Sequence, residues 1–252
     1  MKEMSFGRRL AAAISFLTIF PVAMKGVRSE ELGRSMAFFP LVGLLLGTLL
    51  WSCAFSFGAA FPGAVSALFV LAVLIVVTRG LHLDGLADTL DGLGAGRDKK
   101  DILRIMRDSH VGTFGVIGLV LSLMAKYLLI SELIEARSSL CLLLFPALGR
   151  WSMVYVINFF PYVREEGTAT VFANYVRSRD FWWATGIALL SSILIHGWAG
   201  LGTMVLVWVF THALGHFFVG RIGGITGDVV GASGEFAEIL SLGTLVALLR
   251  CL

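Results

Sequence analysis

The sequence predicts an all-α, polytopic integral membrane protein. We expect a helical bundle of about seven transmembrane helices, with one further helix at the membrane interface near the N-terminus. Two observations predict this class. Of the 252 residues, 57% are hydrophobic and 15% are charged, with a mean hydropathy of +0.87, whereas a soluble domain carries about 25% charged residues. The apolar residues also form long blocks, and a spanning helix needs about 20 of them in succession.

The predicted helices follow from these blocks. The run 10–24 is too short for a confident span and contains Pro21, so we expect an amphipathic or re-entrant interfacial helix there. A secretory signal peptide would look similar, but no small-residue cleavage site follows. No linker, repeat or low-complexity tract divides the chain, which predicts a single domain over residues 1–252. The predicted spans are 37–58, 60–80, 112–133, 139–160, 182–197, 199–219 and 236–251.

The basic residues predict the orientation, because Lys and Arg are retained on the cytoplasmic side of a membrane. Fifteen of the 20 Lys and Arg residues fall in the segments 1–36, 81–111, 161–181 and 220–235. The opposite loops hold only Arg137, with Arg250 near the end of the last helix. We therefore expect an inner-membrane protein with its N-terminus, and every loop rich in polar residues, facing the cytoplasm.

The same residues bear on partners. The basic side chains form no dense patch with interleaved aromatics, so the sequence argues against nucleic-acid binding and leaves the lipid bilayer as the expected surroundings. The glycine spacings at 43–47 and 220–224 permit close helix approach and leave a homo-oligomer open.

Three acids at the start of a polar segment are the strongest functional signal. Asp84, Asp88 and Asp91 are spaced i, i+4 and i+7, so on a helix their directions differ by at most about 60°. Like charges at this spacing repel, and a shared divalent cation removes the conflict. Carboxylate oxygens suit Mg²⁺, which commonly bridges substrate phosphates. The sequence thus predicts a magnesium site with these ligands; the alternative is a solvated acidic helix face, against which the interleaved leucines argue.

The segment "RIMRDSHVGTFG" at 104–115 predicts an anion-binding surface. Arg104 and Arg107 can bind phosphate oxygens through their guanidinium groups. His110 lies before the next apolar run, where the free N–H groups of a helix start favour anions. Alternatively, Arg107 pairs with Asp108 or with a lipid phosphate.

A second acidic segment, "GGITGDVVGASGEFAE" at 223–238, places Asp228 in a glycine-rich break between apolar runs. Broken backbone at membrane depth is tolerated where it lines a cavity or is buried in protein, so Asp228 is a candidate fourth carboxylate. The alternative is a tight turn with acids facing water. Arg150 could reach the same cavity as a substrate-binding residue. We leave the catalytic general base open between Asp228, Asp108 and Glu235.

Acids that hold a divalent cation beside arginines suit transfer at a phosphate ester or anhydride. The metal would neutralise a diphosphate, and a free carboxylate would take the proton from an attacking hydroxyl. From the residues alone, the prediction is a metal-dependent transferase that handles phosphoryl or nucleotidyl groups.

These segments resemble the signature segments of the cobalamin synthase family, the adenosylcobinamide-GDP ribazoletransferases. The resemblance spans nearly the whole chain. It implies a Mg²⁺-dependent membrane enzyme in which a ribose hydroxyl of α-ribazole or its 5′-phosphate attacks adenosylcobinamide-GDP. GMP would leave, and adenosylcobalamin or its 5′-phosphate would form. The matching stretches are "FLTIFPV" at 16–22, "LHLDGLADTLDGL" at 81–93, "RIMRDSHVGTFG" at 104–115, "GR" at 149–150 and "GGITGDVVGA" at 223–232.

Two other functions share some of these sequence features. CDP-alcohol phosphotransferases, which make phospholipids, share a related acid motif, but Gly96 stands where their Arg belongs and their later pair of acids is absent. An ion or solute carrier would place acids near the bilayer midplane, in two matching halves. Here the acids gather at one predicted cytoplasmic edge, and no half-to-half symmetry is visible.

Overall fold

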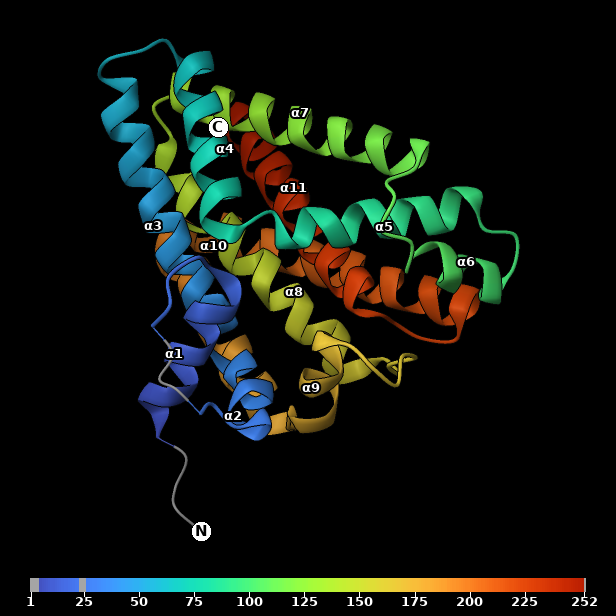
Figure 1. Cartoon of the computed structure of the whole chain (residues 1–252). Helices are drawn as coiled ribbons and strands as arrows, with labels where there is room; N and C mark the ends of the chain where they lie inside the picture. Colours follow the sequence, from blue (N-terminus) through green and yellow to red (C-terminus); the bar gives the residue numbers. More distant parts are fainter. Residues whose placement is uncertain (1–4, 23–25, 252) are drawn as a thin grey trace.

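The computed structural model describes residues 5–22 and 26–251, and it confirms the all-α, polytopic prediction (Figure 1). Within the described residues, extended pairing is limited to one isolated bridge between Tyr162 and Ile225. The elements are α1 (Phe6–Leu17), α2 (Ser29–Gly33), η1 (Arg34–Phe38), α3 (Phe39–Gly58), α4 (Gly63–Thr78), α5 (Leu81–Ala95), α6 (Lys99–Ile105), α7 (Thr113–Glu135), η2 (Ser139–Leu143), α8 (Phe145–Phe159), α9 (Thr168–Tyr175), α10 (Ser178–Ile222) and α11 (Gly227–Cys251).

Five of the described helices are long and apolar enough to cross a membrane, or six if α4 and α5, which meet at 90°, count as one broken span. About seven were expected. The difference arises because α4 is too short to be counted alone, and because the predicted runs 182–197 and 199–219 both fall within α10. The five are Ser29–Gly58, Thr113–Glu135, Ser139–Phe159, Ser178–Ile222 and Gly227–Arg250.

The long helix α10 is folded back on itself at Gly197, whose backbone leaves the helical region with φ 55° and ψ −130°. Tyr155 of α8 contacts both Phe181 and His212, with ring centroids 6.1 Å and 6.2 Å apart. In one straight helix, two residues 31 positions apart would be separated by about 46 Å. The two legs of α10 are therefore antiparallel, and they correspond to the two predicted runs.

The burial pattern is that of a bundle surrounded by lipid. The central helix α8 is buried at every position from Phe145 to Ile157. By contrast, α7 and α10 turn large apolar side chains outward, among them Leu121, Leu194 and Trp198. An outer surface this apolar is unfavourable in water and favourable in hydrocarbon, which agrees with an integral membrane protein.

The turn between α4 and α5, here called the elbow, sets the direction of α5, the helix that carries Asp84, Asp88 and Asp91. Arg79 and Gly80 both adopt left-handed conformations, with φ 57° and φ 61°. The Arg79 guanidinium donates to the carbonyl oxygens of Ser15, Phe16 and Thr18 at the end of α1. The N-terminal helix ends at Leu17, before Pro21 and earlier than the predicted run 10–24, of which residues 23 and 24 lie outside the described residues. Its end is held against the elbow, and α5 turns away to run beside α7 and α11 (Figure 1).

Ion pairs join segments that are far apart in the chain at two places in the bundle. At one place, the Arg250 guanidinium lies 2.8 Å from a carboxylate oxygen of Glu132, close to the turn after α7. At the other, Asp180 pairs with Arg9 and Arg34, at 3.3 Å and 3.2 Å. Two of the segments that the basic residues predict to share one side, 1–36 and 161–181, are thus joined by ion pairs.

Candidate functional site

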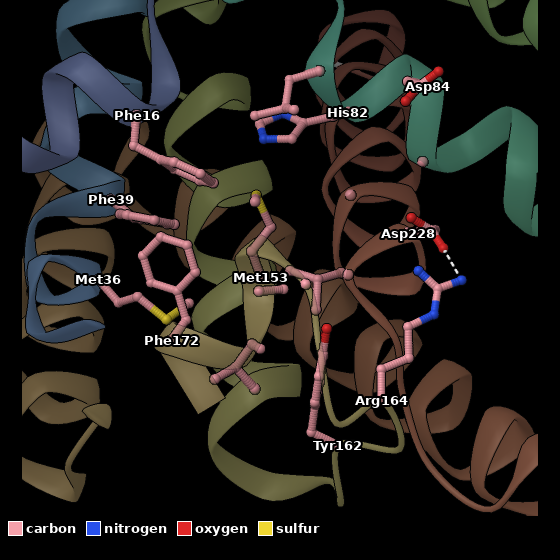
Figure 2. A pocket seen from close by; sticks show the side chains of 18 residues that line it. Phe16, Met36, Phe39, His82, Asp84, Met153, Tyr162, Arg164, Phe172 and Asp228 are labelled. Atoms are coloured by element: carbon pink, nitrogen blue, oxygen red, sulfur yellow. Dashed lines mark ion pairs between the residues drawn. The ribbon is translucent and has the colours of Figure 1, made fainter. Parts of the chain in front are cut away.

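A cavity of about 270 Å³ opens between α1, α3, α5, α8, α9 and α11, and its two halves differ in chemistry (Figure 2). One half is made of aromatic rings and methionine side chains. The other half carries the ionisable side chains. The apolar half contains Phe16, Met36, Phe39, Met153 and Phe172, and the polar half His82, Asp84, Tyr162, Arg164 and Asp228.

The polar half is assembled where α5 crosses α11. A Cβ atom on Gly85 would lie 2.9 Å from the carbonyl oxygen of Asp228, so only glycine allows the two backbones to approach this closely. The crossing brings Asp228 beside the acids of α5. Asp228 was expected in an irregular break, but it lies in the first turn of α11, which begins at Gly227.

Asp84, Asp88 and Asp228 form what we call the acid group. Burial, followed by the negative charges of Asp228 and Asp84, raises the pKa of Asp88 to about 7. This helix, α5, is not itself among the five spanning helices. Burial and the two neighbouring acids outweigh the opposing charge of Arg164, so this group carries more negative than positive charge. The acid group therefore favours a cation.

Arg164 supplies one positive charge to this group. Its guanidinium lies 2.6 Å from a carboxylate oxygen of Asp228, and it donates to the carbonyl oxygen of Met106 at 3.2 Å. Sequence reasoning missed both Arg164 and Tyr162, because the loop after α8 carries no motif. Tertiary pairing brings them in: Val163 N–H donates to the Ile225 carbonyl at 3.0 Å, which fixes this loop to the start of α11.

Asp91 points to a different partner from Asp84 and Asp88. Its buried carboxylate accepts hydrogen bonds from the backbone N–H groups of Gly112 and Gly115, at 2.7 Å and 2.8 Å, and so caps the start of α7. A Cβ atom at either glycine would come within 2.5 Å of this carboxylate, which explains the glycines of "VGTFG". The predicted three-acid stripe is divided, and within the described residues no three His, Cys, Asp or Glu residues lie together as a metal-binding group.

This cap predicts a stability role for Asp91. Asp91→Ala should lower the free energy of unfolding by about 1–2 kcal/mol, because it removes an anion from a helix N-terminus and leaves two buried N–H groups unpaired. Asp91→Asn should cost less, since one acceptor oxygen remains. Thermal unfolding in detergent measures the change.

Asp98→Ala is the matched control, since Asp98 caps the exposed seven-residue helix α6 by accepting from the Asp101 N–H at 2.9 Å. If Asp91→Ala unfolds no earlier than Asp98→Ala, the Asp91 cap does not stabilise the fold.

The predicted anion-binding residues lie on the surface, outside the cavity. Arg104 and Arg107 are exposed, and Arg104 pairs with Asp101. The His110 ring lies 2.7 Å from Asp108. Hydrogen bonds from the His110 side chain and backbone hold the pKa of Asp108 below its usual value, which makes Asp108 a weaker base. A substrate contact at these positions stays a prediction.

Arg150 and Glu235 belong to a buried cluster of ion pairs with Lys126 and Glu238. Lys126 lies 2.7 Å from Glu235 and also pairs with Glu238, which in turn pairs with Arg150. The four residues line a second, much smaller cavity among α4, α5, α7, α8 and α11. The structure thus separates Glu235 and Arg150 from the acid group, and of the three candidate bases it places only Asp228 in the main cavity.

Comparison with known proteins identifies the family. The sequence model of the family described as "CobS: Cobalamin-5-phosphate synthase" matches residues 9–246. An adenosylcobinamide-GDP ribazoletransferase of Geotalea daltonii is 40% identical over 94% of this chain and 96% of its own length. The proteins of that name from Roseiflexus sp. and Acinetobacter baumannii are 38% and 40% identical, over 94% and 93% of this chain and 88% and 95% of their own lengths. No solved structure matches the chain. The chain therefore belongs to the CobS family of cobalamin-5-phosphate synthases.

Proposed function

We propose that this protein is an adenosylcobinamide-GDP ribazoletransferase that works in the cavity between α5 and α11. It transfers the adenosylcobinamide phosphate of adenosylcobinamide-GDP to α-ribazole or α-ribazole 5′-phosphate. GMP leaves, and adenosylcobalamin or its 5′-phosphate forms. The observation that carries this proposal is that Asp84, Asp228 and Arg164 line one cavity, in a chain that matches this family over residues 9–246.

Arg164 and Asp228 suit the two ends of this reaction. A guanidinium binds phosphate oxygens bidentately, so a diphosphate in the cavity would compete with Asp228 for Arg164. Release of Asp228 from this ion pair would leave its carboxylate free to take the proton from the attacking ribose hydroxyl. We assign the general base to Asp228, because Asp108 lies on the surface and Glu235 is bound to Lys126.

The acid group also fits Mg²⁺ in kind. All its donors are carboxylate oxygens, which this ion prefers, and three carboxylates lie beside one guanidinium, that of Arg164. We propose Asp84 and Asp88 as the residues that hold the ion. Asp91, the third predicted ligand, already accepts two backbone hydrogen bonds. When bound, the ion would supply charge neutralisation of the diphosphate.

We place this protein in the inner membrane, with its N-terminus and the cavity on the cytoplasmic side. The excess of Lys and Arg in 1–36, 81–111, 161–181 and 220–235 supports this orientation. Further support comes from contacts that join these segments, such as Arg9 with Asp180 and Arg164 with Met106.

A GMP-release assay tests the proposal. Purified protein with α-ribazole and adenosylcobinamide-GDP should release GMP in the presence of Mg²⁺, and the rate should fall at least about 100-fold after exhaustive chelation, because the metal supplies charge neutralisation of the diphosphate. Incubation with a CDP-alcohol and a lipid acceptor is the control and should give no CMP. Undiminished turnover in chelator would refute the magnesium site, and CMP release would favour the phospholipid-synthesis alternative.

A further inference from the structure

The apolar half of the cavity is a continuous aromatic wall built from three separate helices. Phe16 of α1 and Phe172 of α9 meet edge to face at 4.7 Å between ring centroids. Phe39 of α3 lies 5.5 Å from Phe172 and is nearly parallel to Phe16 at 6.0 Å. Figure 2 shows these rings on one side of the cavity, with Met36 and Met153 beside them and Asp84, Asp228 and Arg164 on the other side.

His82, in the polar half, lies between Phe16 and Asp84 in Figure 2. Its side chain is 4% exposed, and its Nε2 atom has no hydrogen-bond partner among the described residues. A buried ring nitrogen without a partner costs free energy. An occupant of the cavity with one complementary nitrogen would satisfy it.

The size and chemistry of the cavity select among the parts of the two substrates. Its volume of about 270 Å³ lies just below the usual range of ligand sites, about 300–1,000 Å³, so it cannot enclose a corrin macrocycle. Guanine carries several donors and acceptors on its edge, and rings and thioethers would leave them unpaired. A benzimidazole is flat and apolar except for one free ring nitrogen.

We propose that the aromatic wall of Phe16, Phe39 and Phe172 binds the benzimidazole base of α-ribazole, with His82 facing its free ring nitrogen. This inference rests on the proposed function and adds the acceptor subsite to it. The base stacks on the wall while its ribose extends toward Asp228 in the polar half. The ribose hydroxyl then approaches the diphosphate from the side of the cavity that holds the base.

Equilibrium dialysis of the purified full-length protein against α-ribazole alone tests the subsite without turnover. Phe172→Leu keeps an apolar side chain but removes the aromatic contact, and should weaken binding about 3- to 10-fold. Phe39→Leu should do the same and carries the test if Phe172→Leu fails to fold. The matched control is Phe55→Leu on α3, whose side chain is 74% exposed and lies away from the cavity; it should bind like the unchanged protein.

Competition and turnover distinguish the possible failures. Guanosine should not displace α-ribazole; displacement would make the wall a guanine subsite and overturn the proposal. Absence of α-ribazole binding, or equal binding by all variants, would also overturn it. In the GMP-release assay the KM for α-ribazole should rise in Phe172→Leu, while that for adenosylcobinamide-GDP stays the same. If α-ribazole binds through this wall but no GMP appears, the proposed function fails and the subsite stands.

Discussion

Asp88→Asn should lower kcat/KM for GMP release at least about 100-fold, the scale expected when a group that acts on charge or protons in the transition state is lost. Asp88 is a half-buried member of the acid group, and its pKa of about 7 reflects burial together with the charges of Asp228 and Asp84. Asparagine preserves the shape and removes the charge that would hold Mg²⁺. The measurement is steady-state GMP release by purified protein at saturating Mg²⁺.

The control for this prediction is Glu166→Gln, which removes an exposed acid from the loop that follows Arg164. This variant should retain nearly full activity, because its charge faces solvent and is screened by salt. Full activity in Asp88→Asn with an unchanged unfolding midpoint would remove Asp88 from the site. A loss of activity in both variants would indicate a general electrostatic effect and not a specific one.

Glu238→Gln should produce the largest loss of stability, about 3–5 kcal/mol, because breaking a buried ion pair leaves an uncompensated charge inside the protein. Glu238 is 1% exposed and pairs with both Lys126 and Arg150. Lys126 would keep Glu235 as a partner, whereas Arg150 would lose its carboxylate. Equilibrium unfolding in detergent with a chemical denaturant measures the effect.

An exposed ion pair supplies the matched control for Glu238→Gln. Glu132 pairs with Arg250 at 2.8 Å, with 41% and 69% of the side chains exposed, so Glu132→Gln should cost at most about 1 kcal/mol. The double variant Glu238→Leu with Arg150→Met removes one charge of each sign and should recover much of the stability. If the double variant is as unstable as Glu238→Gln, the loss does not come from an unpaired charge.

The residues of the acid group can be singled out from the sequence, whereas their partner Arg164 cannot. Asp84, Asp88 and Asp228 stand out because ionisable residues beside apolar runs are rare. Arg164 carries no such signal, since it lies in a polar loop among other charged residues, and only the pairing of Val163 with Ile225 sets it against Asp228.

Asp91 and Glu235 show that spacing along a helix does not identify the partner of a side chain. Asp91 shares a helix face with Asp88 by spacing, but the start of α7 lies within hydrogen-bond reach and takes its carboxylate. Glu235 follows Asp228 by two helical turns, yet it faces Lys126 of another helix. Spacing along one helix fixes relative direction and leaves the identity of the neighbouring helix open.

The composition and the apolar blocks predict a helical membrane bundle, which the structure confirms. That the polar loops share the cytoplasmic side stays a prediction from the Lys and Arg residues. Apolar composition, the length of the apolar blocks and the distribution of Lys and Arg act on the bilayer without any long-range contact in the chain. Tertiary packing sets the fold-back of α10 at Gly197 and the cap that Asp91 forms on α7. It also places aromatic rings from α1, α3 and α9 across one cavity from Asp84 and Asp228. The physical reason is that these contacts join residues far apart in the chain, and their geometry depends on how whole helices pack.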